Sequence, residues 1–274
     1  MNDPVDPAAP DTTVPDPALS EDLALALRLA DAADAVSSAR FRANDLHVST
    51  KPDRTFVTDA DKSVERAIRS LIAAERPGDG IYGEEYGIEG DSPRQWIIDP
   101  IDGTANYLRG VPVWGTLIAL VVDKTPVVGV ASAPALGKRW WAATGGGAWA
   151  QEGDGEPYRI RVSGVSDLAD ASISFQSIQQ WDEHGYLDRL VALTRSVWRD
   201  RAYGDLWSYA MLAEGLIDAV GEFGVQPYDV AALIPIVEEA GGRFTSVSGG
   251  SGLWNGQPLA TNGVLHDAII DALR

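Results

Sequence analysis

Residues 96–110 read Trp-Ile-Ile-Asp-Pro-Ile-Asp-Gly-Thr-Ala-Asn-Tyr-Leu-Arg-Gly, in which an apolar triplet runs directly into oxygen-bearing side chains. The triplet predicts a short buried strand that ends at Asp99, because Pro100 cannot donate to a strand ladder. Asp102 follows, beside a glycine and a threonine. Hard divalent cations prefer such oxygens, and phosphate binds the N–H groups of such a turn. Asp-Pro and Asp-Gly are also common turn dipeptides, so an ordinary structural turn is the alternative for these residues taken alone.

The composition is that of an ordinary globular protein. The chain has 274 residues, of which 45% are hydrophobic and 23% charged, enough for one large domain or for two halves that share a core. No apolar run is long enough to predict a membrane span, and the N-terminus lacks the basic and apolar regions of a signal peptide. The absence of cysteine excludes disulfides, thiolate metal sites and cysteine nucleophiles. We therefore expect a cytoplasmic protein without a membrane partner.

The formal charge of −18 also restricts the partners. It repels nucleic acids and anionic membranes, and it repels a phosphorylated substrate unless bound cations reverse the local field. We therefore expect some of the excess acids to be metal ligands and most to be solvated surface. The three histidines, His47, His184 and His266, have no metal-like spacing and are predicted to be surface or loop residues. Acid–base chemistry then falls to carboxylates, hydroxyls and bound water.

The order of the predicted elements indicates a layered protein. Residues 1–18 hold five prolines and four aspartates and are predicted to be a disordered tail. The remainder, residues 19–274, is predicted to form a single domain with an α+β half at about 19–165 and an α/β half at about 166–274. Helices are expected at residues 20–40, 58–77, 187–193, 206–214 and 230–240, the last kinked at Pro235. Strands are expected at residues 116–122, 127–131, 138–143, 148–150, 159–162, 172–175 and 244–247.

Three further segments share a pattern with the opening stretch. They are Gly83-Glu84-Glu85, Lys51 with Val57-Thr58-Asp59-Ala60-Asp61, and Pro227-Tyr228-Asp229-Val230-Ala231-Ala232. Together with residues 96–110 they resemble the inositol monophosphatase family of magnesium-dependent phosphatases. The resemblance implies an alternating αβαβα sandwich of the inositol monophosphatase and fructose-1,6-bisphosphatase type.

The resemblance also implies a set of metal ligands. Asp99, Glu84 and the Ile101 carbonyl would hold one Mg²⁺, and Asp99 and Asp102 would share a second, with Asp229 as its remote ligand. Two or three ions are expected, and Mn²⁺ is the alternative metal. Two positions depart from the family pattern, since Tyr228 replaces a tryptophan and Ala105 replaces a threonine or lysine. Neither change removes an expected ligand.

The catalytic roles likewise come from the resemblance. Asp61 and Thr104 would orient the attacking water, and Glu84 would act with them, whereas Asp59 is interpreted as an acid favoured at a helix start. The N–H groups of Gly103 and Thr104, with Asp102, would contact the substrate phosphate. The expected reaction is hydrolysis of a phosphate monoester by in-line attack of a metal-activated water.

Three more segments favour one substrate within the family. Residues 111–114, 138–143 and 198–205 resemble the bacterial histidinol-phosphatase branch, which implies L-histidinol phosphate as substrate and a role in histidine biosynthesis. That substrate carries an ammonium and an imidazole, which acids and aromatic faces would bind. Asp205, Glu222 and Asp229 are the expected acids, and Arg201 would orient the substrate. A structural Arg201–Asp205 ion pair and an exposed loop position for Glu222 are the alternatives.

Two other functions stay open at this point. One is an inositol-1-monophosphatase or another small phosphate monoesterase of the same family. The other is a non-catalytic interaction protein, because some family members act as binding partners in RNA metabolism, although the charge of −18 argues against direct RNA contact. By the same resemblance we expect a homodimer, with the hairpin around Trp140 as the candidate interface.

Overall fold

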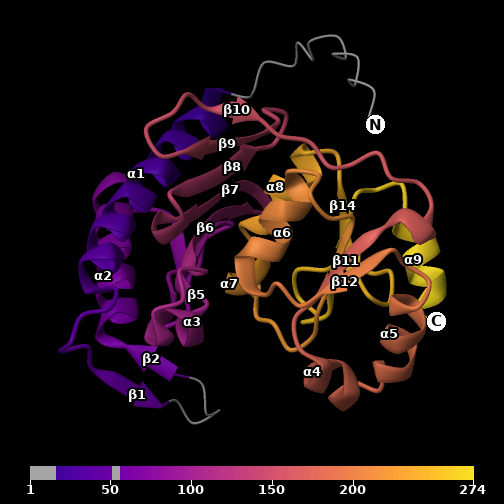
Figure 1. Cartoon of the computed structure of the whole chain (residues 1–274). Coiled ribbons are helices and arrows are strands. Elements are labelled where there is room, and N and C mark those ends of the chain that lie inside the picture. The colour runs from indigo at the N-terminus through magenta and orange to yellow at the C-terminus, as the bar shows by residue number, and fades with distance from the viewer. Residues whose placement is uncertain (1–16, 51–55) are drawn as a thin grey trace.

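Helices and sheets alternate as α-β-α-β-α layers, as predicted (Figure 1). The computed structural model describes residues 17–50 and 56–274. The predicted tail up to residue 16 and Lys51 lie outside these described residues. The first layer consists of α1 (Pro17–Arg40) and α2 (Asp59–Glu75), which lie side by side. No helix in the described part of the chain is long and apolar enough to cross a membrane.

The second layer is a mixed sheet whose strand order is β10-β9-β8-β7-β6-β5-β3-β4. Only β3 and β5 pair in parallel within it; the other neighbours are antiparallel. Its strands are β3 (Gly80–Gly83), β4 (Gly87–Glu89), β5 (Arg94–Asp102), β6 (Gly115–Val122), β7 (Thr125–Ala133), β8 (Lys138–Ala143), β9 (Ala148–Glu152) and β10 (Tyr158–Arg159). The strand predicted at residues 159–162 is therefore wrong beyond Arg159.

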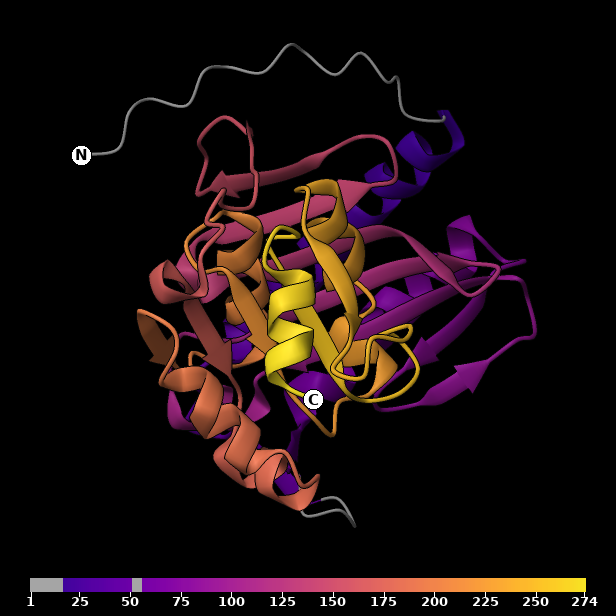
Figure 2. The same ribbon diagram turned by 90° about the vertical axis from the view of Figure 1, so that its right-hand side faces the viewer.

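The remaining layers belong to the second half of the chain. Helices α6 and α8 fill the space between the first sheet and a second sheet of order β12-β11-β13-β15-β14, and Figure 2 shows α9 on its outer face. The bounds are β11 (Ser172–Phe175), α4 (Ile178–Glu183), α5 (Leu187–Thr194), β12 (Arg199–Arg201), α6 (Asp205–Ala213), β13 (Ala219–Gly221), α7 (Pro227–Val230), α8 (Leu233–Glu239), β14 (Arg243–Ser246), β15 (Pro258–Thr261) and α9 (His266–Ala272). Smaller elements are the hairpin β1 (Val48–Thr50) and β2 (Phe56–Thr58), α3 (Thr104–Arg109), and the 3-10 turns η1 (Pro134–Leu136) and η2 (Leu168–Asp170).

Strand β5 is central because both of its faces are buried. Trp96 and Ile98 pack in the core under α1 and α2, while Ile97 packs in the core that α6 and α8 cover. Successive side chains of a strand point to opposite faces, so the apolar triplet seals two cores at once. The chain beyond the triplet is thereby held rigidly where the cores end.

The predicted end of this strand is wrong in an informative way. β5 continues through Pro100 to Asp102, and the register shifts between Asp99, which pairs with Leu117, and Asp102, which pairs with Gly115. One extra residue on the β5 side makes a β-bulge, where a missing proline N–H is tolerated. The bulge places both aspartates at the same edge of the sheet.

Three other expectations also need correction. α1 begins at Pro17, before the predicted start at Ser20. The helix predicted at 230–240 is two helices rather than one kinked helix, because the Pro235 ring would clash with the carbonyl four residues earlier. His266 is fully buried instead of exposed, and its ring nitrogens lie 3.0 Å from the Thr245 and Thr261 hydroxyls.

Candidate active site

The two aspartates of the bulge open into a cavity of about 300 Å³ between the two halves of the fold. Six of its described lining residues are acidic. No lysine, arginine or histidine is among the described residues that line it. The acids are Glu84, Asp99, Asp102, Asp205, Glu222 and Asp229. Such a cavity repels a phosphate ester until positive charge is added.

Glu84 reaches the cavity because β3 and β5 run in parallel. Gly83 is paired with Ile98, and the Glu84 N–H donates to the Ile98 carbonyl at 3.2 Å. Glu84 and Asp99 therefore follow the last paired residues of two adjacent strands. Carboxyl ends of parallel strands lie at one edge of a sheet, so the parallel pair explains why these acids meet.

Burial and neighbouring negative charges disfavour the ionised form of the two carboxylates in the bulge. Burial, and then the charges of Glu84, Asp102 and Asp229, hold the pKa of Asp99 well above its usual range. The pKa of Asp102 is also well above its usual range, through burial and then Asp205 and Asp229. Oxygens of Asp99, Asp102 and Asp229 all lie within 4.8 Å of one another. Repulsion of this kind is relieved by a cation bound among the oxygens.

One carboxylate oxygen of this cluster has no hydrogen-bond donor among the described residues. It is Oδ1 of Asp99, a residue that is only 2% exposed. A buried charged oxygen without a donor is costly and rare in folded proteins. The donor set of hard oxygens around it fits Mg²⁺ or Mn²⁺, which prefer carboxylate ligands.

Asp61 and Thr104 are brought together, as predicted, at the start of α2 and α3. Asp61 is fully buried and accepts from the Thr58 N–H at 2.8 Å and the Thr58 hydroxyl at 2.5 Å, in a capping box. The Thr104 hydroxyl lies 3.4 Å from Asp61 and 3.0 Å from the Ile101 carbonyl. Thr104 lines the cavity and Asp61 lies behind it.

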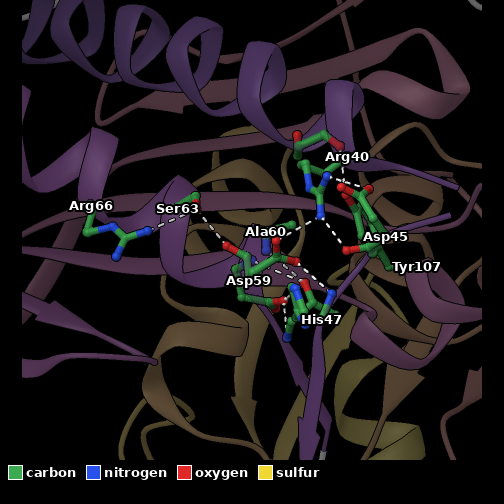
Figure 3. A network of polar contacts seen from close by, with 11 residues as sticks. Arg40, Asp45, His47, Asp59, Ala60, Ser63, Arg66 and Tyr107 are labelled. Carbon is green, nitrogen blue, oxygen red and sulfur yellow. Dashed lines mark hydrogen bonds and ion pairs between the residues drawn. The ribbon is translucent and has the colours of Figure 1, made fainter. Parts of the chain in front are cut away.

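Asp59 has a different environment, although it lies only two residues before Asp61. Its carboxylate accepts from the Arg40 guanidinium at 2.8 Å and from the His47 N–H at 3.2 Å, in the network drawn in Figure 3. These contacts tie α1 and the segment before β1 to the start of α2. Asp59 is therefore a structural acid, as its position at the helix start indicated.

Asp229 lies in the short helix α7 and lines the cavity together with Glu84. One carboxylate oxygen accepts from the Gln226 N–H at 2.6 Å, which fixes the side chain at the helix start. The preceding Tyr228 packs edge-on against Tyr82 of β3, with ring centroids 5.9 Å apart. The aromatic residue that replaces the family tryptophan thus joins α7 to the Glu84 strand.

Glu222 is buried instead of exposed in a loop, so that alternative is wrong. It is 5% exposed, lines the cavity and accepts a hydrogen bond from the Tyr209 hydroxyl at 2.5 Å. Burial, partly offset by this hydrogen bond, raises the pKa of Glu222 to about 8. Sequence reasoning missed Tyr209, because it lies within an apolar helix and has no motif around it.

Asp205 lies at the start of α6 with a φ of 50°, a left-handed conformation that costs a non-glycine residue free energy. Amide groups of Asn106 and Gln176 donate to its carboxylate at 2.7 and 3.0 Å. The next N–H, that of Leu206, donates to Asp102 at 2.7 Å. Gln176 and Asn106 were also missed, since nothing local in the sequence marks them.

Arg201 is not brought into the cavity. It is exposed on the edge strand β12, and its guanidinium donates to the Asp200 carbonyl at 2.6 Å. Asp205 is held by amides, so the structure offers no support for the alternative of an Arg201–Asp205 ion pair.

Comparisons with known proteins agree with this arrangement. The inositol monophosphatase family profile matches residues 18–274. A histidinol-phosphatase of Mycobacterium tuberculosis is 52% identical over 254 residues, which span 92% of this chain and 98% of that protein. A histidinol-phosphatase of Streptomyces coelicolor is 51% identical, over 92% of this chain and 97% of that protein. A solved structure of an inositol monophosphatase from Zymomonas mobilis superposes with a TM-score of 0.81 at 31% identity, covering 94% of this chain and 99% of that one. The chain therefore belongs to the inositol monophosphatase family.

Proposed function

We propose that the protein is a Mg²⁺-dependent phosphatase that hydrolyses L-histidinol phosphate. The observation that carries the proposal is the cavity itself, in which six acids converge and no cationic side chain is among the described lining residues. The names of the relatives from Mycobacterium tuberculosis and Streptomyces coelicolor favour histidinol phosphate over other phosphate esters.

The proposed ligands come from the family resemblance, and they are supported by the oxygens of Asp99, Asp102 and Asp229, which lie within 4.8 Å of one another. Asp99, Glu84 and the Ile101 carbonyl would hold one ion, while Asp99, Asp102 and Asp229 would hold a second. The unpartnered Oδ1 of Asp99 supports this assignment, since it needs a positive partner. When bound, the ions supply positive charge that attracts the phosphate and stabilises charge on the leaving oxygen. Two or three ions are proposed, with Mn²⁺ able to replace Mg²⁺.

The chain's own groups would orient the reactants. Thr104 would direct the attacking water along the line of the phosphorus–oxygen ester bond, and the 3.4 Å contact of its hydroxyl with Asp61 supports this role. The N–H groups of Gly103 and Thr104 would hold phosphate oxygens at the start of α3. The ester bond breaks as water attacks, and the leaving alcohol takes up a proton.

The leaving group would lie toward the second half of the molecule. Glu222 and Asp205 line that side of the cavity beside the amides of Gln176 and Gln180. Carboxylates and amide oxygens accept hydrogen bonds from an ammonium or an imidazolium, which a neutral polyol cannot match in charge. Arg201, which is exposed at the end of β12, is kept as a proposed substrate contact.

A substrate comparison tests the proposal. Phosphate release at a fixed Mg²⁺ concentration is measured with L-histidinol phosphate and with inositol 1-phosphate. We expect kcat/KM to be about a hundredfold higher for histidinol phosphate, because buried acids are left unpaired by the polyol. The variant Glu222→Gln should lose most of this preference while it still hydrolyses inositol 1-phosphate. Equal turnover of the two esters by the unmodified protein would contradict the substrate assignment.

The wider role follows the same proposal. We propose that the enzyme acts in histidine biosynthesis in the cytoplasm, as a homodimer. Deleting its gene should create a requirement for histidine, provided that no second phosphatase serves the step. Growth of the deletion strain without histidine, in the absence of such a phosphatase, would argue against this role.

A further inference from the structure

A buried acid outside the cavity lies directly beneath the turn that carries Glu84. Glu65 of α2 has no exposed side-chain surface, and it is not among the residues that line the cavity. Its Oε2 accepts from the Glu85 N–H at 2.7 Å, and its Oε1 accepts from the Tyr86 N–H at 3.2 Å. The carboxylate therefore binds the two N–H groups that immediately follow Glu84.

Gly83, which precedes the turn, leaves space for this carboxylate. A Cβ atom at Gly83 would lie 2.0 Å from Oε1 of Glu65, closer than any real contact allows. Residue 83 ends β3 and precedes Glu84, so the glycine lets the helix side chain reach under the strand end. A larger residue at position 83 would push the Glu65 carboxylate away from the two N–H groups that follow Glu84, so the glycine acts here through space rather than through a positive φ.

Arg69 offsets the charge of this buried acid. Its Nε donates to Glu65 at 2.7 Å, and the same guanidinium binds Glu89 at 3.0 Å and the Gly87 carbonyl. Charge-assisted hydrogen bonds are stronger than neutral ones, and a bound cation makes a buried carboxylate tolerable. Both oxygens of the Glu65 carboxylate are therefore engaged, through the N–H groups of the turn of residues 84–86 and the Arg69 guanidinium.

We propose that Glu65, together with Arg69, is a positioning residue for Glu84. Its carboxylate fixes the turn after β3, and this sets how tightly the cavity binds a divalent cation. The inference rests on the proposed function, since it takes Glu84 as a metal ligand. Groups that orient metal ligands in this way typically change metal affinity by about 10- to 100-fold when they are removed.

Direct titration of the full-length protein with MnCl₂ in a calorimeter tests the proposal without substrate. Glu65→Gln should bind Mn²⁺ about 10- to 100-fold more weakly, and Arg69→Gln should bind it severalfold more weakly. In Glu65→Gln, saturating metal should restore most of kcat, and the KM for the ester should stay unchanged. A general loss of structure would not separate metal affinity from substrate affinity in this way.

Two controls make the outcome decisive. Glu89→Gln removes another carboxylate from Arg69 but leaves the Glu65 contacts in place, so its Mn²⁺ affinity should match that of the unmodified protein. A folded Glu65→Gln protein with unchanged Mn²⁺ affinity would overturn the inference. If Glu65→Gln does not fold, Arg69→Gln decides in the same way. Unchanged affinity in Glu84→Gln would instead overturn the metal-ligand assignment within the proposed function.

Discussion

Acidic side chains lie beside both ends of strand β5, and their surroundings differ. At the start of the strand, the Arg94 guanidinium donates to Asp22 at 2.9 Å and to Asp79 at 3.1 Å. At the end of the strand, Asp99 and Asp102 face further carboxylates across the cavity, with no cationic side chain among the described lining residues. Among the described residues, the sheet therefore holds one compensated cluster of acids beside Arg94 and one uncompensated pair, Asp99 and Asp102.

The difference indicates which cluster is built for function. Buried acids at the first end are stabilised by the chain itself, as in an ordinary structural ion pair. At the other end, burial and repulsion raise the pKa values of Asp99 and Asp102 well above their usual range, a cost that no cationic side chain among the described lining residues relieves. Local violations of this kind concentrate at functional sites. The missing positive charge is expected to come from bound metal ions.

At the uncompensated end of β5, removal of an acid should lower the activity but raise the stability of the metal-free protein. We expect Asp99→Asn to lower kcat/KM by about a thousandfold, equal to about 4 kcal/mol of transition-state stabilisation, and to weaken Mg²⁺ activation. The metal-free variant should be more stable than the unmodified protein at neutral pH, because the repelling charge is gone. Rate assays across Mg²⁺ concentrations and thermal unfolding in EDTA check both effects. Unchanged Mg²⁺ dependence in Asp99→Asn would contradict the comparison.

Removal of the cation should be harmful at the compensated end. Arg94→Met leaves Asp79 without its guanidinium and, among the described residues, leaves Asp22 with only the more distant Arg76, at 3.4 Å. This should lower the unfolding free energy by about 2 kcal/mol and Tm by about 5 °C. This loss of unfolding free energy is smaller than the usual cost of breaking a buried ion pair, because the Arg94 side chain is 33% exposed. Mn²⁺ affinity should not change. Arg274→Met, which breaks an exposed pair, is the matched control and should leave Tm unaltered; a similar drop in both variants would contradict the prediction.

The smallest expected effect is on the pH dependence of the metal-free protein. Since burial raises the pKa of Glu222 to about 8, the folded state binds this proton more tightly than the unfolded chain does. Its contribution to stability is therefore complete at acidic pH and is lost as the pH rises toward 8. Glu222→Gln should flatten this decline and raise Tm by a few degrees at pH 8 in EDTA, whereas Glu156→Gln, at an exposed loop, should not. If Tm falls with pH in the same way for the unmodified protein and for Glu222→Gln, the raised pKa of Glu222 would be contradicted.

The sequence predicted the elements whose causes are local. The apolar triplet before Asp99 forms the buried strand, and Thr58 with Asp61 begins α2, because strand burial and helix capping depend on neighbouring residues. The bulge at Pro100 was not predicted, since it depends on how β6 pairs across it. The proximity of the cavity acids came from a resemblance to a family, not from spacing alone.

Residues that act through distant contacts were beyond local reasoning. Glu65 looks like any acid on an amphipathic helix until β3 is placed above it, and Gln176 acquires a role only when Asp205 is brought beside it. Arg201 shows the opposite case, since its motif matches the family but its exposed side chain is not among the described residues that line the cavity. Sequence patterns thus indicate chemistry well, whereas the groups that position it depend on packing across the two halves.

Anomalous diffraction from crystals soaked in MnCl₂ tests the contrast between the two ends of β5 most directly. We predict strong manganese peaks in the cavity, within ligand distance of Asp99, Asp102 and Asp229, and no peak beside Asp22 and Asp79. Crystals with manganese absent from the cavity, at concentrations that saturate the activity, would contradict the claim that metal ions neutralise the uncompensated acids.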